Sequence, residues 1–154
     1  MNSMMITVYI LLGAGAVCIG SQAPLAAADL LIPATHRAPG QTPVQRGKKV
    51  YEQTCMPCHQ VDASGVPGMN PPLRKSPYVG GHSARLIGIV LQGLNDGVEI
   101  AGDTYSNPMP AFSTVLKDGE IADVLSYLRS HFGNKAGPIS LAQVSRIRQI
   151  LKNK

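Results

Sequence analysis

The sequence predicts an all-α, single-domain protein with three to five helices. Its 154 residues suit one domain. Three segments have the residue patterns of helices, at positions 42–55, 82–95 and 118–133. Twelve prolines and sixteen glycines indicate that long loops connect these helices. The expected architecture is therefore a few helices joined by extended loops.

The first expected helix begins at Thr42 and runs into Cys55. Thr42 suits the N-cap position, and Pro43 suits the first helical position because no partner is needed there for its missing N–H. Gly47, Tyr51 and Cys55 are four residues apart, so they share one face of the helix. A glycine costs about 1 kcal/mol in a helix interior, so Gly47 calls for a structural reason.

The middle helix is expected over residues 82–95. His82 stands at its start, beside two glycines, and is expected at the surface or as a cap. The apolar side chains that repeat at helical spacing, and so are expected to face the core, are Leu86, Ile87, Val90, Leu91 and Leu94.

The last of the three helices is expected over residues 118–133. Asp118 suits the N-cap position, and further acidic residues follow it near the positive end of the helix dipole. Gly133 is expected to end the helix. The inward stripe of this helix consists of Ile121, Val124, Leu125 and Leu128.

The chemistry lies in residues 55–59, Cys-Met-Pro-Cys-His. A Cys-x-x-Cys pair is compatible with zinc, with a redox-active thiol pair and, when a histidine follows directly, with covalent haem attachment. Structural zinc needs four protein ligands, and the chain has no second Cys-x-x-Cys and no His-x-x-x-His. A thioredoxin-like pair needs a βαβ context, whereas a loop-like stretch follows His59. Zinc and thiol redox chemistry are therefore less favoured.

Covalent haem attachment uses all three residues of the motif. Cys55 and Cys58 lie on one helical turn, where their thiols match the two vinyl groups of a haem and can form thioethers. The adjacent His59 then reaches the iron. The sequence therefore predicts one covalently bound haem c.

With this motif, the chain resembles the class I c-type cytochromes, and most of all the single-haem domains in cytochrome subunits and partners of bacterial dehydrogenases. The resemblance extends from about Thr42 to Asn134 and implies a cytochrome c fold. It implies that Gly47 lets the first and last helices cross closely. It also implies that the carbonyl of Pro71 accepts a hydrogen bond from the ring of His59, which fixes the orientation of that ligand.

The residue on the far side of the iron decides between electron transfer and catalysis. Outside the N-terminal residues 1–28, the candidates for this second iron ligand are Met56, Met69, Met109, His36, His82 and His131. Met56 lies inside the attachment turn, and Met69 lies in the loop expected to support His59. Met109 comes much later in the chain, between two prolines that stiffen its loop. The run Tyr105–Phe112 matches the distal-ligand segment of the family, so the resemblance implies that His59 and Met109 are the metal ligands. The alternative is a methionine that fills a gap in the core.

The N-terminal residues 1–28 are predicted to be a signal peptide. Residues 4–20 are almost wholly apolar, and three alanines precede Asp29, the expected new N-terminus. The leader has no Lys or Arg, so an uncleaved membrane anchor is the alternative. Cleavage removes Cys18 and leaves the two cysteines of the motif. The protein is therefore expected in the periplasm, with residues 29–41 as a flexible lead-in.

The positive charge is concentrated in the C-terminal tail, residues 135–154, beyond the haem domain at 42–134. The tail carries five basic residues and no acidic one, whereas the other 134 residues carry nine of each sign. Its apolar positions fall on one side of a helix. The tail is expected to be a basic helix that docks on an acidic partner or an anionic membrane, or that packs on its own domain. No motif for nucleic acid binding is present.

These expectations favour an electron transfer protein over an enzyme, because an iron with two protein ligands offers no open position to a substrate. The predicted function is to carry one electron from a periplasmic or membrane dehydrogenase to a downstream cytochrome or terminal oxidase. One alternative is a non-catalytic cytochrome subunit of a dehydrogenase complex. The other is a haem enzyme of the peroxidase or gas-binding type, which requires an open iron site.

Overall fold

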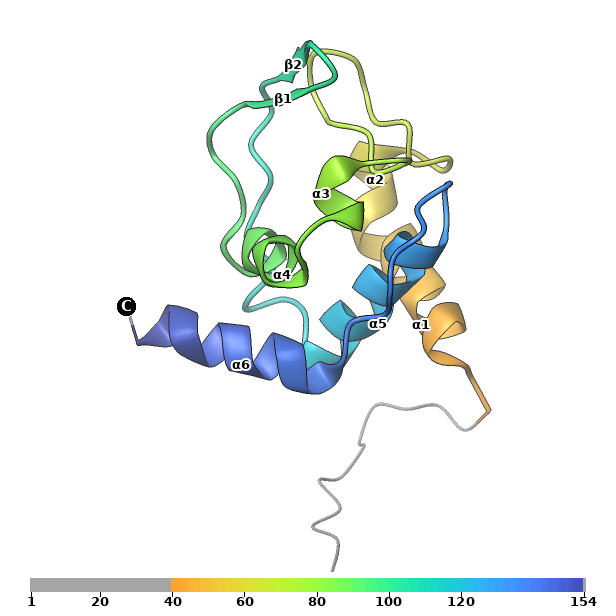
Figure 1. The fold of residues 1–154 in the computed structure, drawn as a ribbon, viewed down its shortest axis with the longest axis vertical. Coiled ribbons are helices and arrows are strands. Elements are labelled where there is room, and N and C mark those ends of the chain that lie inside the picture. The colour runs from red at the N-terminus through yellow and green to blue at the C-terminus, as the bar shows by residue number, and fades with distance from the viewer. Residues whose placement is uncertain (1–39, 154) are drawn as a thin grey trace, which may run out of the picture. The chain divides into compact units, whose positions relative to one another are not determined.

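The computed structural model describes residues 40–153, and these form a largely helical domain (Figure 1). The predicted signal peptide and nearly all of the predicted lead-in lie outside the described residues. The elements, in chain order, are α1 (Pro43–Val50), a π-helical turn (Tyr51–Cys55), α2 (Met56–His59), α3 (Pro77–Gly80), α4 (Ser83–Gln92), β1 (Val98–Ile100), β2 (Asp103–Tyr105), α5 (Asp118–Ser130) and α6 (Leu141–Lys152). The predicted helical fold class is confirmed. A small hairpin of β1 and β2 adds to it, with Glu99 opposite Thr104 in antiparallel register.

The first helix starts as predicted but continues further. Thr42 caps α1 by accepting a hydrogen bond from the backbone N–H of Gln45, and Pro43 occupies the first helical position. The helical path does not end at Cys55. It widens into the π-helical turn and continues through α2 to His59. Such π-helical turns are frequent at functional sites, and this one carries the first cysteine of the motif.

Helices α1 and α5 cross (Figure 1), and Gly47 lies where they touch, as the resemblance implied. A Cβ atom at Gly47 would lie 2.6 Å from the backbone carbon of Asp123 and 2.8 Å from the Cβ of Tyr127. Only a glycine therefore fits at this crossing. Beside it, the guanidinium of Arg46 donates to both carboxylate oxygens of Asp123, at 2.6 and 3.0 Å. This half-buried ion pair holds the two helices in register.

The middle helix matches its prediction except at its end. Four of the five apolar residues expected to face the core are buried, and His82 is exposed at the N-cap position. The fifth, Leu94, is not on the helix, because α4 ends at Gln92 and Gly93 turns the chain with φ +78°. Leu94 instead pairs with Met109 across two backbone hydrogen bonds of 2.8 and 2.9 Å. The end of α4 is thereby joined to the loop that carries Met109.

Both expected ends of the last helix differ in the structure. The N-cap position of α5 is Lys117, whose backbone N–H donates to the carboxylate of Glu120. Asp118 is the first helical residue, and its carboxylate accepts from Arg148 of α6 at 2.6 Å. The prediction of Asp118 as N-cap was wrong because this side chain faces another helix. The helix ends at Ser130, three residues before Gly133.

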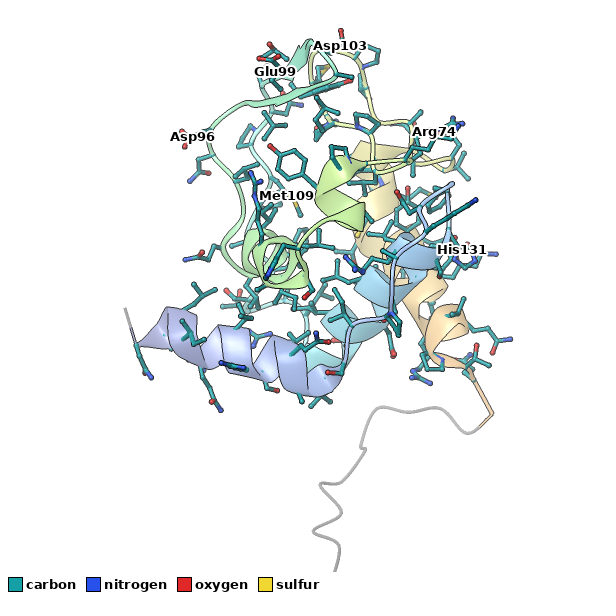
Figure 2. The ribbon with its side chains drawn as sticks, viewed as in Figure 1. Arg74, Asp96, Glu99, Asp103, Met109 and His131 are labelled. Carbon is teal, nitrogen blue, oxygen red and sulfur yellow. The ribbon has the colours of Figure 1, made fainter. Side chains whose placement is uncertain are left out.

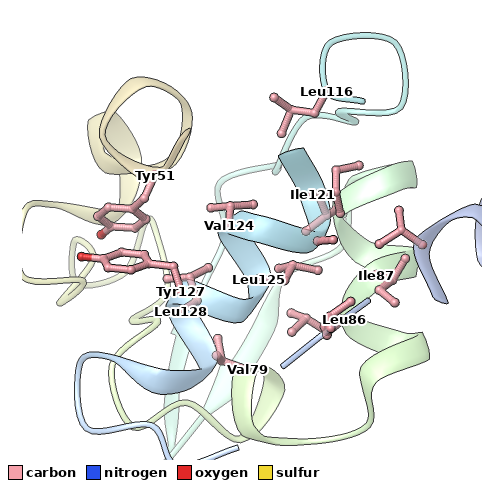
Figure 3. Close-up of a cluster of buried hydrophobic side chains, with 14 of the residues drawn as sticks. Tyr51, Val79, Leu86, Ile87, Leu116, Ile121, Val124, Leu125, Tyr127 and Leu128 are labelled. Atoms are coloured by element: carbon pink, nitrogen blue, oxygen red, sulfur yellow. The ribbon is translucent and has the colours of Figure 1, made fainter. Parts of the chain in front are cut away.

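Helix α5 contributes more residues to the hydrophobic core than any other element (Figure 3). All four residues of its predicted inward stripe are buried, and Ile121 and Leu125 are almost fully enclosed. Tyr51 packs against Tyr127 and Phe132, with ring centroids 5.8 and 5.3 Å apart. This aromatic cluster joins the end of α5 to the turn that holds the cysteine motif.

The C-terminal tail forms α6, which packs on α4 and α5 rather than extending away from them (Figure 1). Val144 is fully buried, and Ile147 and Leu151 pack against the core. Arg148 ties α6 to the start of α5 through Asp118, with an N–O distance of 2.6 Å. Within residues 40–153, no helix is both long and apolar enough to cross a bilayer.

Candidate functional site

A largely apolar cavity opens between α2, α4, α5 and the loop that precedes α5. Its walls include all five residues that the sequence singled out, namely Cys55, Cys58, His59, Pro71 and Met109. Aliphatic side chains of α4 and α5, among them Val90, Leu125 and Leu128, form much of the remaining surface. Figure 2 shows Met109 between α4 and the β1–β2 hairpin. The fold therefore collects residues far apart in the sequence around one apolar space.

The two cysteines reach the cavity from the π-helical turn and α2. Cys55 is half-buried and Cys58 is exposed, and both are free thiols. Burial, and then the neighbouring Cys58, raises the pKa of the Cys55 thiol to about 12. Redox-active Cys-x-x-Cys pairs instead have a lowered thiol pKa. Within the described residues, no group of three or more His, Cys, Asp and Glu side chains is arranged to hold a metal ion. The raised pKa of Cys55 is thus the opposite of what a thioredoxin-type pair shows.

His59 is held by a hydrogen bond to the loop that follows it. Its Nδ1 lies 2.9 Å from the carbonyl oxygen of Pro71. Because a carbonyl can only accept, Nδ1 carries the proton and Nε2 keeps its lone pair. Burial lowers the pKa of His59, and only the hydrogen bond to Pro71 opposes this. The imidazole is therefore neutral at neutral pH, which is the form that binds a metal.

The loop that presents Pro71 is shaped by Gly65, a residue that no sequence motif pointed to. Gly65 has φ +70°, and its missing Cβ would lie 2.7 Å from the carbonyl carbon of Pro71. The backbone N–H of Gly65 also donates to the carbonyl of His59 at 3.0 Å. A glycine a few residues after the motif was visible in the sequence, but its contact with Pro71 depends on the fold.

Met109 reaches the cavity from a loop that is fixed at several points. Its backbone pairs with Leu94, and prolines stand on both sides of it. Gly93 allows this approach, because a Cβ there would lie 2.9 Å from the backbone nitrogen of Ala111. Met109 itself is half-buried and contacts the core. Its side chain is therefore presented to the cavity by a constrained backbone.

The other candidate ligands are not part of the cavity wall. Met69 is exposed, and Met56 lies within the turn of the motif. His82 is exposed at the start of α4, and His131 stacks on Tyr127 with ring centroids 4.3 Å apart. His36 lies outside the described residues. Of the methionine and histidine candidates in the described part of the chain, Met109 is the one that faces the cavity together with His59.

A set of hydrogen bonds joins the loop of Pro71 to the loop of Met109. We call the residues that make these bonds, 68–70 and 106–107, the loop latch. The backbone N–H groups of Ser106 and Asn107 donate to the carbonyls of Gly68 and Met69, at 3.2 and 3.0 Å. The side chain of Asn107 also donates to that of Asn70, at 3.3 Å. The sequence did not predict this contact, because no local pattern pairs two loops that are so far apart in the chain.

The residues of the cavity fit a covalently attached haem. Paired thiols and a free imidazole nitrogen lie on one wall, and a methionine lies in the same apolar space. In addition, the hydroxyl of Ser76 lines the cavity, is buried, and has no hydrogen-bond partner within residues 40–153. A buried hydroxyl left without a partner is costly, and a polar group at the edge of a cofactor would satisfy it.

Comparison with known proteins agrees with this fit. The family model described as Cytochrome c matches residues 44–132. The cytochrome c-552 of Thermus thermophilus is 35% identical over 98 residues, which cover 57% of this chain and 69% of that protein.

Cytochrome subunits of dehydrogenases are similar to the same region. The cytochrome c subunit of a quinone alcohol dehydrogenase from Gluconobacter oxydans is 35% identical over 108 residues, covering 66% of this chain and 22% of that subunit. The gluconate 2-dehydrogenase cytochrome c subunit of Pantoea cypripedii is 36% identical over 95 residues, covering 60% and 21%. This chain thus spans about a fifth of the length of these two subunits.

Proposed function

Because this chain belongs to the cytochrome c family, and therefore carries covalently bound haem c and transfers electrons, we propose how its own residues perform that task. Cys55 and Cys58 would hold the haem through two thioethers. His59 and Met109 would bind its iron. Pro71 holds the ring of His59. When bound, the haem supplies a centre that takes up and releases one electron.

The observation that carries this proposal is the hydrogen bond between His59 and Pro71 within the cavity that Met109 also lines. The bond keeps the proton on Nδ1 and directs the lone pair of Nε2 away from Pro71. It also raises the basicity of the ring as a ligand. The constrained loop of Met109 limits how far its sulfur can move away.

Two protein ligands favour an electron carrier over a peroxidase or a gas-binding enzyme. A thioether paired with an imidazole raises the reduction potential. The apolar walls keep water from the cavity, and stiff loops on both sides limit rearrangement when the charge changes. The side chains of this site thus favour electron exchange without providing an open position for a substrate.

We place the protein in the periplasm, with residues 1–28 removed as a signal peptide. Membership of the cytochrome c family supports a location outside the cytoplasm. The similarity to dehydrogenase cytochrome subunits supports a dehydrogenase as electron donor, and a downstream cytochrome or terminal oxidase is the proposed acceptor. A fixed place within a dehydrogenase complex is the second candidate, favoured by the same relatives.

The test uses protein matured in a host that attaches haem to exported proteins. We expect the mass of one haem on the peptide that contains Cys55 and Cys58, and none after both are changed to alanine. The ferrous wild-type protein should bind carbon monoxide slowly, whereas Met109→Ala should bind it rapidly and have a lower reduction potential. Rapid binding by the wild-type protein would instead support the open-site enzyme.

A further inference from the structure

We propose that the groove between α4 and α6 is a docking surface for an acidic electron transfer protein. The inference rests on the proposed function and names the class of partner and the place where it binds. We call this surface the α4–α6 groove. It is lined by Ala84, Arg85, Gly88, Ile89, Gln92, Gly93, Leu94, Ile147, Ile150 and Leu151.

The floor of the α4–α6 groove is apolar and partly open. Ile150 is 45% exposed, whereas Ile147 and Leu151 beside it on α6 are half-buried. Gly88 adds to the depth of the groove, since a Cβ there would meet nothing within 4 Å. An exposed isoleucine beside such a hollow gives a partner an apolar contact to cover.

The rim of the groove is basic. Arg85 of α4 is exposed on the groove itself, and its guanidinium lies 4.6 Å from the ring centroid of Tyr78. On α6, Arg146 is exposed one turn before Ile150, on the same side of the helix. Neither α4 nor α6 contains an Asp or a Glu. Charge complementarity therefore selects a partner whose contact surface is acidic.

The groove lies directly behind the haem cavity. Ile89 and Leu94 line both spaces, so one layer of side chains separates them. Leu94 is also the residue whose backbone pairs with Met109, at 2.8 and 2.9 Å. A protein seated in the groove would thus reach the Met109 side of the cavity through Leu94. This proximity favours a redox partner over a purely structural one.

The test measures reduction of the haem-loaded protein by reduced flavodoxin, an acidic electron donor protein, at low ionic strength. Arg146→Glu should lower the second-order rate constant roughly tenfold, because it reverses a charge on the rim. Ile150→Ala should lower it about threefold through loss of apolar contact. The matched control is Lys49→Glu, which makes the same charge change on α1, where Lys49 is exposed. It should leave the rate within about twofold of wild type.

Reduction by ascorbate separates docking from haem function. All variants should be reduced by ascorbate at the wild-type rate, and a wild-type protein that ascorbate cannot reduce would contradict the proposed function itself. Equal effects of Arg146→Glu and Lys49→Glu on the flavodoxin rate would overturn the groove proposal, because net charge would then explain both.

Two further results, each indicating a different occupant of the α4–α6 groove, would also overturn the groove proposal. One is a lipid surface, indicated if Arg146→Glu abolishes flotation with phosphatidylglycerol vesicles but leaves the flavodoxin rate unchanged. The other is a second copy of this chain, indicated if Ile150→Ala dissociates a dimer in sedimentation without changing that rate.

Discussion

At the scale of single residues, the site depends on side chains whose protonation is set by burial. His59 is kept neutral and is fixed by Pro71. Burial, and then the neighbouring Cys58, raises the pKa of the Cys55 thiol to about 12. Both effects come from the apolar walls of the cavity. The walls that would enclose a haem thus favour the neutral form of His59, which is the form that binds a metal.

Tyr51 is a third buried group, and it binds the backbone next to the Cys-x-x-Cys-His motif. Its hydroxyl donates to the carbonyl of Gln60, directly after His59. Burial is the largest cause that raises the pKa of Tyr51 to about 12, with the neighbouring Cys55 next. An unfolded tyrosine ionises near pH 10. The stabilisation from the neutral phenol is thus complete below about pH 10 and is lost as the pH rises toward about 12.

Tyr51→Phe tests this linkage. At neutral pH the variant should lose about 1 kcal/mol of unfolding free energy, because the carbonyl of Gln60 loses its donor. Between about pH 10 and pH 12 the difference should shrink and then reverse, since phenylalanine cannot ionise. Urea unfolding of both proteins across this range measures it. A difference that stays constant with pH would mean that the phenol of Tyr51 does not titrate as a buried group.

At the scale of elements, the close crossing of α1 and α5 is set by one glycine. Gly47→Ala should lower the unfolding free energy by about 2 kcal/mol, because the added methyl group forces the helices apart at Asp123 and Tyr127. Helix propensity alone would favour alanine by about 1 kcal/mol. Thermal or urea unfolding of the haem-loaded protein provides the measurement.

Gly88→Ala is the matched control for this substitution. Gly88 also lies inside a helix, but nothing stands within 4 Å of the position of its missing Cβ. The variant should therefore be stabilised by up to about 1 kcal/mol. If both alanine variants change stability in the same direction, the close approach at Gly47 does not limit the packing of α1 on α5.

The loop latch is the second feature at this scale, because it closes the cavity by joining its two loops. Asn107→Ala removes the bond to Asn70. One lost hydrogen bond, worth about 1 kcal/mol, should raise the population with an open latch about fivefold. Carbon monoxide should then bind the ferrous protein about five times faster, while the unfolding free energy changes by no more than about 1 kcal/mol.

The control for the latch is Asn95→Ala, which removes an exposed asparagine from the loop after α4. This variant should bind carbon monoxide at the wild-type rate. If Asn95→Ala and Asn107→Ala bind carbon monoxide equally fast, the latch does not restrain Met109.

At the scale of the whole molecule, sequence patterns predicted the long helices and the cavity residues well. The stripe of α5 and the capping of α1 by Thr42 follow from local rules of periodicity and hydrogen bonding. The residues of the cavity wall could be located because their types and order resemble a known family. Each of these features is carried by neighbouring residues or by a recognisable motif.

What could not be predicted depends on contacts between distant segments. The short helix α3 and the β1–β2 hairpin have too few residues for a periodic pattern. Asp118 had the local features of an N-cap, but Arg148 pairs with it from α6. The tail was compatible with either a free docking helix or a packed one, and the burial of Val144 shows that it is packed.

The central claim is that Met109 and His59 would both bind the iron of one covalently attached haem. Proton NMR of the reduced protein tests it most directly, because a methionine methyl group held over the haem ring is shifted far upfield by the ring current. The account predicts one such three-proton signal in the wild-type protein, lost in Met109→Ala and kept in Met69→Ala. A spectrum without this signal, or one in which it survives Met109→Ala, would contradict the account.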